Sequence, residues 1–209
     1  MPRPIIVAIV LAGVLAGIAA ARLFGGADDA APQLEQAVLF QVPRPLPQAT
    51  LAAADGSSFG TASLGGRWTF LFFGFVNCPD ICPTTLATLA AVGKSLADLP
   101  PAERPAVAFV SVDPGRDTPE VLARYVAHFD PAFEAATGSA AAIEAWTRAL
   151  GVAVIIGPPA ADGSYTVDHS AAVFLVDPDA REAALFGAPH DAGAIARDYR
   201  RIVAARRAG

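Results

Sequence analysis

The 209-residue chain has few residues that bind soft metals or form disulfides: two cysteines, three histidines and one methionine, which is Met1. The cysteines, Cys78 and Cys82, lie four residues apart, and a disulfide across so short a loop would gain little chain-entropy stabilisation. This argues against a disulfide-stapled fold, and the pair is interpreted as chemically active. The single, initial methionine excludes a methionine-rich metal site beyond the N-terminal segment.

Positive charge is scarce beyond the first residues of the chain. All 20 acidic residues but only 13 of the 15 basic residues lie after position 27, so this part carries a net charge of about −7, against −5 for the whole chain. A negative domain without a cluster of lysines and arginines is a poor binder of nucleic acid. We therefore exclude nucleic acid as a partner.

The N-terminal segment lacks charge altogether between Ile5 and Ala21, and is bounded by Arg3 and Arg22. A membrane-spanning helix needs about 17–25 apolar residues, so we expect a transmembrane anchor within residues 1–24, with the chain start in the cytoplasm. The alternative is a cleaved signal peptide ending at the alanines 19–21. Either interpretation places the rest of the chain in the periplasm, and the first makes it a single-pass protein of the cytoplasmic membrane.

Residues 25–48 are rich in glycine, alanine, proline and glutamine, and predict an extended linker; residues 49–209 then form one domain. Asp55-Gly56 predicts a hairpin, and the apolar run Trp68–Val76 predicts a buried central strand. Strands are further expected over residues 106–113, 171–177 and 182–187, and helices over 118–129, over 143–152, and from 79 and 192 onward. This alternation predicts an α/β fold with helices flanking a mixed central sheet.

The two cysteines lie where the predicted central strand passes into a helix. Proline is tolerated in the first helical turn, which suits Pro79 and Pro83. Positions i and i+4 share one helix face, so the sulfurs of Cys78 and Cys82 can converge. Free N–H groups at a helix start favour the thiolate, which is both metal ligand and nucleophile. The pair therefore leaves metal binding and redox chemistry open.

His169 precedes the predicted strand over 171–177. Redox proteins of the thioredoxin type separate their cysteines by two residues, whereas three separate Cys78 from Cys82. A third ligand must therefore decide between redox chemistry and metal binding, and His169 is the candidate. Asp168 is either a group that orients its imidazole or an exposed loop carboxylate. From the residues alone, His169 is equally explained as a strand-start residue that hydrogen-bonds to the backbone.

Three motifs resemble the Sco/SenC/PrrC family of copper chaperones: GFVNCPDICPTTL at 74–86, VSVDPGRDTPEVLARYVAHF at 110–129 and VDHSAAVFLVDP at 167–178. The resemblance covers about residues 40–205, with the motifs in the family's order and spacing. Members of that family are membrane-anchored proteins of thioredoxin fold that are implicated in assembling the binuclear copper site of cytochrome c oxidase.

The resemblance implies a thioredoxin-like fold and assigns Cys78, Cys82 and His169 as copper ligands. Thiolates favour Cu(I), and imidazole adds a borderline donor; Cu(II) could bind with an added oxygen ligand. An open three-coordinate site suits transfer of the ion, whereas four closed ligands would indicate structural zinc. The departures from the family pattern, Gly115 and Asp179-Ala180, do not involve a ligand position.

The expected function is that of a copper metallochaperone, which receives copper from a periplasmic donor and delivers it to subunit II of cytochrome c oxidase without catalytic turnover. The alternative is a thiol–disulfide oxidoreductase that keeps the copper-site cysteines of the target reduced, with Cys78 or Cys82 as nucleophile. Peroxide removal is disfavoured because the chain has no further cysteine to resolve the product.

The charged residues of the second motif have a less specific interpretation. Asp113, Arg116 and Asp117 follow a predicted strand, and helix capping explains much of their pattern. We assign them a structural or docking role rather than a place among the ligands. His128 and His190 are interpreted as a packed surface-edge residue and a solvated loop residue.

Overall fold

The computed structural model describes residues 4–5, 12–14, 17 and 32–208. The chain divides into two units, Met1–Gln33 and Leu34–Gly209. In the part of the chain that is described, no helix has the length and apolar character needed to cross a bilayer. Most of the anchor expected within residues 1–24 lies outside the described residues, so it stays a prediction.

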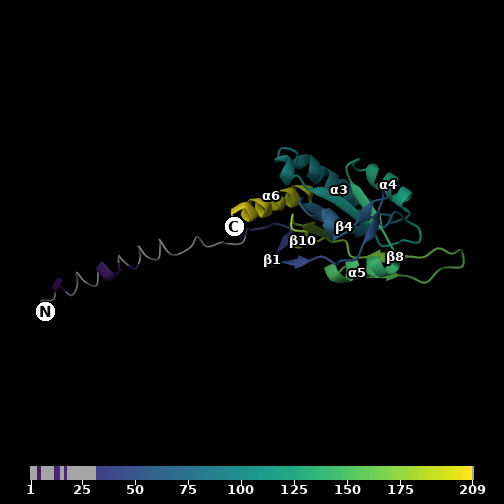
Figure 1. Cartoon of the computed structure of the whole chain (residues 1–209), viewed down its shortest axis with the longest axis horizontal. Helices are drawn as coiled ribbons and strands as arrows, with labels where there is room; N and C mark the ends of the chain where they lie inside the picture. Colours follow the sequence, from purple (N-terminus) through teal and green to yellow (C-terminus); the bar gives the residue numbers. More distant parts are fainter. Residues whose placement is uncertain (1–3, 6–11, 15–16, 18–31, 209) are drawn as a thin grey trace. The chain divides into compact units, whose positions relative to one another are not determined.

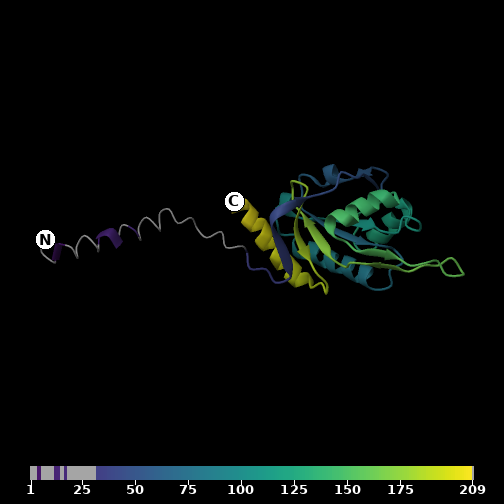
Figure 2. The same cartoon turned by 90° about the horizontal axis from the view of Figure 1, so that it is seen from below.

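The second unit contains an eight-stranded mixed sheet with the strand order β1-β10-β9-β4-β5-β6-β2-β3 (Figures 1 and 2). Strands β4, β5 and β6 run parallel, and the remaining neighbours are antiparallel. The strands are β1 (Ala37–Pro45), β2 (Leu51–Ala53), β3 (Ser58–Phe59), β4 (Thr69–Gly74), β5 (Ala106–Ser111), β6 (Glu134–Thr137), β9 (Val173–Val176) and β10 (Arg181–Phe186). The expected mixed α/β architecture is confirmed.

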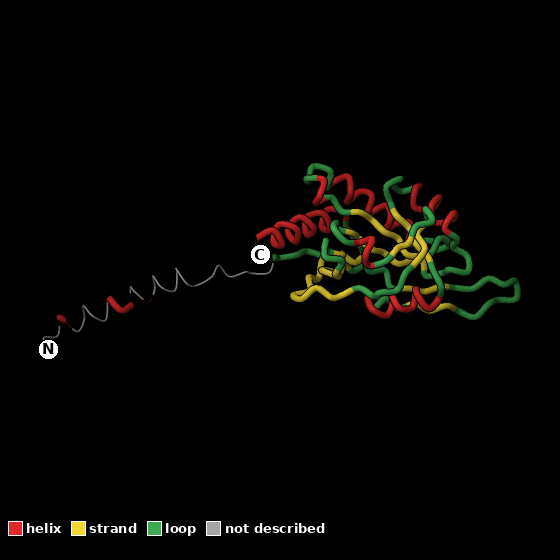
Figure 3. Tube along the Cα trace, viewed as in Figure 1, coloured by secondary structure: helices red, strands yellow, loops and turns green. Residues whose placement is uncertain are grey.

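Helices cover both faces of this sheet, as Figures 1 and 3 show. They are α2 (Thr61–Leu64), α3 (Ile81–Ser95), η1 (Pro101–Glu103), α4 (Pro119–Ala127), α5 (Ala140–Leu150) and α6 (Ala192–Ala208), of which η1 is a 3-10 helix. Helices α3, α4 and α6 lie on one face of the sheet, and α5 lies on the other. A second, two-stranded sheet consists of β7 (Val154–Ile156) and β8 (Val167–His169).

The centre of the core is β4, in which every residue is buried. Side chains alternate between the two faces of a strand, and both faces of β4 are covered. Phe70 packs against Tyr199 of α6 with 5.4 Å between ring centroids, whereas Phe73 contacts Phe174 of β9 edge to face. This double burial explains the continuous apolar run that predicted a central strand.

The folded unit begins earlier than the expected boundary at residue 49. Strand β1, which lies within the predicted linker, pairs with β10 at the edge of the sheet. The prolines that favoured a linker are compatible with an edge strand, where no neighbour requires their missing N–H groups. Fully buried Asp198 of α6 fixes the start of this segment, since its carboxylate accepts the backbone N–H groups of Glu35, Gln36 and Ala37 at 2.7–2.9 Å.

Replacing Asp198 with alanine should release β1 from α6. Three backbone donors would lose a charged acceptor, so we expect the free energy of unfolding to fall by about 2–4 kcal/mol. Urea unfolding followed by circular dichroism measures the change. Asp98→Ala is the matched control, because Asp98 is exposed and its carboxylate also pairs with a residue of α6, Arg200. Equal losses in the two variants would contradict the anchoring role of Asp198.

Candidate metal centre

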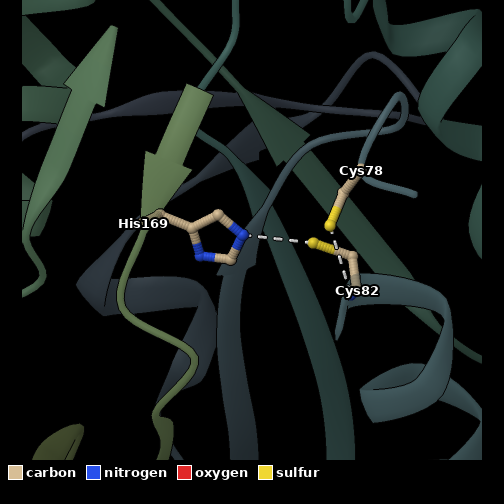
Figure 4. A group of neighbouring side chains, drawn as sticks. All are labelled: Cys78, Cys82 and His169. Carbon is tan, nitrogen blue, oxygen red and sulfur yellow. Dashed lines mark hydrogen bonds between the residues drawn. The ribbon is translucent and has the colours of Figure 1, made fainter. Parts of the chain in front are cut away.

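Three side chains from two distant parts of the chain meet at one end of the sheet (Figure 4). Cys78 and Cys82 lie at the junction between β4 and α3, and His169 is the last residue of β8. Their ligand atoms all lie within 4.8 Å of one another. The Cys82 Sγ and His169 Nε2 atoms are 3.2 Å apart, although the two residues are 87 positions apart in the chain. The structure therefore brings the three sequence-predicted site residues together.

The start of α3 sets the positions of the two sulfurs. Asp80 occupies the N-cap position without a side-chain capping bond. The Cys82 N–H instead donates to the Cys78 Sγ at 3.4 Å, which satisfies one of the free donors of a helix start. Pro83 falls in the same first turn, where its missing N–H costs little. The expected strand-to-helix junction is confirmed, but the helix begins at Ile81, so Cys78 and Pro79 precede its first turn rather than lying in it.

Gly74, the last residue of β4, makes room for the buried sulfur. A Cβ atom at this position would lie 2.7 Å from the Cys82 Sγ and 2.8 Å from the Phe109 Cε2. Both distances are shorter than real Cβ contacts, so any side chain would displace the sulfur or the ring. The sequence motif contains this glycine, but its packing role is visible only in three dimensions.

The two cysteines differ in their exposure. Cys82 is 0 % exposed and Cys78 is 9 % exposed, and burial raises the pKa of the Cys82 thiol. The expectation that the helix start favours the thiolate is therefore wrong for Cys82, since desolvation outweighs the N–H groups around it. A bound metal ion would supply the compensating positive charge that this thiolate requires.

The His169 imidazole is held in the tautomer that a metal ligand needs. Its Nδ1 lies 2.9 Å from the Ser170 carbonyl oxygen, which can only accept, so Nδ1 carries the proton. The lone pair of Nε2 then faces Cys82, and burial lowers the pKa of His169, which keeps the ring neutral. Asp168 is exposed, and the group that orients the imidazole is the Ser170 carbonyl rather than this carboxylate.

Aromatic rings form the inner wall of the site. Phe72 and Phe75 contact the His169 imidazole with ring centroids 6.1 and 5.8 Å away, at interplanar angles of 63° and 84°. A pocket of about 240 Å³ opens in front of the site. Its lining residues are Phe75, Cys78, Pro79, Asp80, Ile81, Val167, Asp168 and His169. Cys78 and His169 thus face the opening, whereas Cys82 lies behind them.

Asp117 supports the loop that carries the cysteines. Its Oδ2 accepts hydrogen bonds from the Val76 N–H at 3.0 Å and from the Ser111 hydroxyl at 2.6 Å. These bonds join the loop after β4 to the end of β5, and burial raises the pKa of Asp117. The structural role expected for this residue is confirmed.

The other two histidines lie outside the three-residue group. His128 is exposed at the end of α4 and contacts Phe129 edge to face. His190 is half-buried, and its Nε2 donates to the Ala171 carbonyl oxygen at 2.8 Å. The interpretation of His190 as a solvated residue is therefore wrong.

The donor set fits a single soft ion. Nitrogen and sulfur ligands bind metals at about 2.0–2.3 Å, so donors to one ion lie up to about 4.6 Å apart. The ligand atoms of this group lie within 4.8 Å of one another, and the Cys82 Sγ and His169 Nε2 atoms are 3.2 Å apart, so the three donors can reach one ion with little movement. Two sulfurs and one imidazole nitrogen form a donor set that suits copper, with thiolates selecting Cu(I).

Gly74→Ala should distort the centre without altering a ligand. The new methyl group would press on the Cys82 Sγ and the Phe109 ring, so we expect weaker Cu(I) binding in a chelator competition and an overpacking loss of about 1–3 kcal/mol in unfolding free energy. Gly93→Ala in α3 is the control, since nothing lies within 4 Å of its Cβ position. It should stabilise the helix by up to about 1 kcal/mol and leave copper affinity unchanged. Equal copper affinities in the two variants would contradict the close-approach role of Gly74.

Comparison with known proteins places this centre in a family. Residues 47–204 match the family model described as SCO1/SenC. The mitochondrial SCO2 homologue of Bos taurus is 40% identical over 147 residues, which cover 69% of this chain and 54% of the relative. The chain thus spans about half the length of this relative.

Solved structures of relatives share the fold. Arabidopsis thaliana ScoI with copper bound is 32% identical, with a TM-score of 0.69 over 78% of this chain and 99% of that one. BsSco, a member of the Sco family of cytochrome c oxidase assembly proteins with a disulfide switch, is 25% identical, with a TM-score of 0.58 over 79% of this chain and 98% of that one. These likenesses support the thioredoxin-like fold, and with the Cys-Cys-His group they support copper binding. The family match over residues 47–204 shows that the chain belongs to the SCO1/SenC family.

Proposed function

We infer that this protein is a copper metallochaperone that holds copper at Cys78, Cys82 and His169 and delivers it to the binuclear site of cytochrome c oxidase subunit II. The observation that carries the proposal is the convergence of two sulfurs and an unprotonated imidazole nitrogen within 4.8 Å. The copper bound in Arabidopsis thaliana ScoI supports copper as the metal. BsSco belongs to the Sco family of cytochrome c oxidase assembly proteins, which supports the oxidase as the target.

The arrangement of the ligands gives the transfer an order. Cys78 and His169 line the open pocket, whereas Cys82 is fully buried behind them. A thiolate of the acceptor can therefore bind the ion from the pocket side while the bond to Cys78 breaks. Cys82 then releases the ion last.

The cellular setting forms part of the same proposal. The uncharged segment Ile5–Ala21 supports a membrane anchor within residues 1–24, which would hold the folded unit on the periplasmic side of the cytoplasmic membrane. A periplasmic donor would supply the copper. The anchor would also confine the protein to the membrane that contains its target.

A second function, thiol–disulfide exchange with the copper-site cysteines of the target, is favoured by one observation. The two free thiols lie four residues apart, Cys78 in the loop before α3 and Cys82 in its first turn, and Cys78 faces the pocket. An accessible thiol with a second thiol nearby suits thiol–disulfide exchange. The disulfide switch of BsSco agrees with this chemistry.

His169→Ala separates the two functions. Loss of a direct ligand should lower Cu(I) affinity by more than about a hundredfold, since even groups that orient a ligand contribute 10–100-fold, while disulfide exchange continues. Competition with a Cu(I) chelator and the nitrogen contribution in X-ray absorption measure the loss. His128→Ala, on the exposed end of α4, is the control. Unchanged copper affinity together with slower thiol exchange would favour the redox function instead.

The transfer order predicts unequal reactivity of the two cysteines. In the folded, reduced, metal-free protein, iodoacetamide should modify Cys78 well before Cys82, because Cys82 is buried and its raised pKa disfavours the thiolate. Mass spectrometry of peptides measures both rates. In denaturant the rates should become similar. Faster modification of Cys82 in the folded protein would reverse the proposed order.

A further inference from the structure

His169 belongs to a hairpin that stands apart from the main sheet. Strands β7 and β8 form a two-stranded sheet of their own, in which Val154 pairs with His169. Figures 1 and 2 show that the loop joining them extends beyond the elements around it. Besides the short connection to β9 and the buried Val167, the position of the imidazole relative to the sulfurs depends on how this hairpin contacts the β5 side of the main sheet.

Tyr165, two residues before β8, makes one such contact with the main sheet. Its hydroxyl donates to the Asp113 Oδ1 at 2.5 Å. Asp113 lies just after β5 and is 1 % exposed, so this hydrogen bond reaches from the hairpin to the main sheet. The fit is close, because a Cβ on Gly115 would lie 3.3 Å from the Tyr165 hydroxyl oxygen.

Arg116 also contacts Tyr165, at its ring and at its backbone carbonyl. Its guanidinium carbon lies 3.8 Å from the centroid of the Tyr165 ring, and its Nη1 donates to the Tyr165 carbonyl oxygen at 3.2 Å. The Arg116 Nε also forms an ion pair with Asp113. Arg116 thus binds the ring and the backbone of the hairpin residue while it is itself fixed to the main sheet.

A further contact leads from Arg116 toward the imidazole. Its guanidinium carbon lies 5.9 Å from the Phe75 ring centroid, and Phe75 packs edge to face on His169. Arg116 therefore supports His169 by two routes, through the hairpin that carries the histidine and through the ring that covers it.

We propose that Arg116 and Tyr165 are positioning residues that dock the β7–β8 hairpin on the Asp113 loop and so hold the His169 imidazole within bonding reach of Cys78 and Cys82. They do not bind copper themselves. The inference rests on the proposed copper site and adds to it the groups that decide whether the third ligand is in place.

Tyr165→Phe tests the proposal in a double-mutant cycle with His169→Ala. The phenylalanine keeps the ring beneath Arg116 and removes only the hydrogen bond to Asp113. Because one hydrogen bond to a carboxylate is lost, we expect Cu(I) affinity to fall about tenfold in the presence of His169. In the His169→Ala background the same substitution should have no effect.

Tyr199→Phe is the matched control for this cycle. It removes a tyrosine hydrogen bond of the same 2.5 Å length, from Tyr199 to the Glu103 carbonyl oxygen. Neither of these residues belongs to the hairpin or to the copper group. Its Cu(I) affinity should stay within twofold of the unsubstituted protein. Equal losses with Tyr165→Phe and Tyr199→Phe, or a Tyr165→Phe loss that persists without His169, would overturn the positioning role.

The metal-free protein provides a readout independent of copper. Long-range ¹H–¹⁵N NMR spectra should show His169 with a protonated Nδ1 and a bare Nε2, and Tyr165→Phe and Arg116→Lys should shift or broaden these signals. Unchanged His169 signals in both variants would overturn the proposal. If those signals respond but the unsubstituted protein binds no copper, the proposed function fails and the positioning role stands.

Discussion

The centre depends on the 3.2 Å approach between the Cys82 Sγ and the His169 Nε2. Cys82 lies in the first turn of α3 and His169 ends strand β8 of the two-stranded sheet, so several local features must agree before the atoms can meet. Gly74 leaves space for the sulfur, and the Ser170 carbonyl fixes the tautomer of the imidazole. The short contact between sulfur and nitrogen thus explains why Gly74 and the Ser170 carbonyl are needed, although neither binds a metal.

Burial gives this contact its chemical consequence. Desolvation disfavours the charged forms of both groups, because it raises the pKa of Cys82 and lowers that of His169. Burial therefore favours a neutral Cys82 thiol beside a neutral His169 imidazole when no metal is bound. A soft cation removes the thiol proton and restores the charge balance, so an apolar surrounding selects for a metal while it suppresses a free thiolate.

The sequence was most informative where one local pattern coincided with one element. The apolar run around β4 and the cysteine spacing predicted where the two sulfurs meet, although Cys78 lies in the loop before α3 and not on the face of the helix. Strand β1 was missed because its prolines suit both a linker and an edge strand. Strand β8 was missed because its three residues contain exposed Asp168 and half-buried His169, and its pairing with β7 spans a ten-residue connection. Two three-residue strands that pair across such a connection are too short to show the alternation of apolar and polar residues by which a strand is predicted.

The two halves of the centre are fastened differently. The sulfurs lie on a buried strand-to-helix junction, which Asp117 ties to β5 through the Val76 N–H. The imidazole lies on a hairpin whose link to β5 runs through the side chains of Tyr165 and Arg116. The contacts of Tyr165 and Arg116 therefore help to set the position of the imidazole, whereas the strand-to-helix junction sets that of the sulfurs.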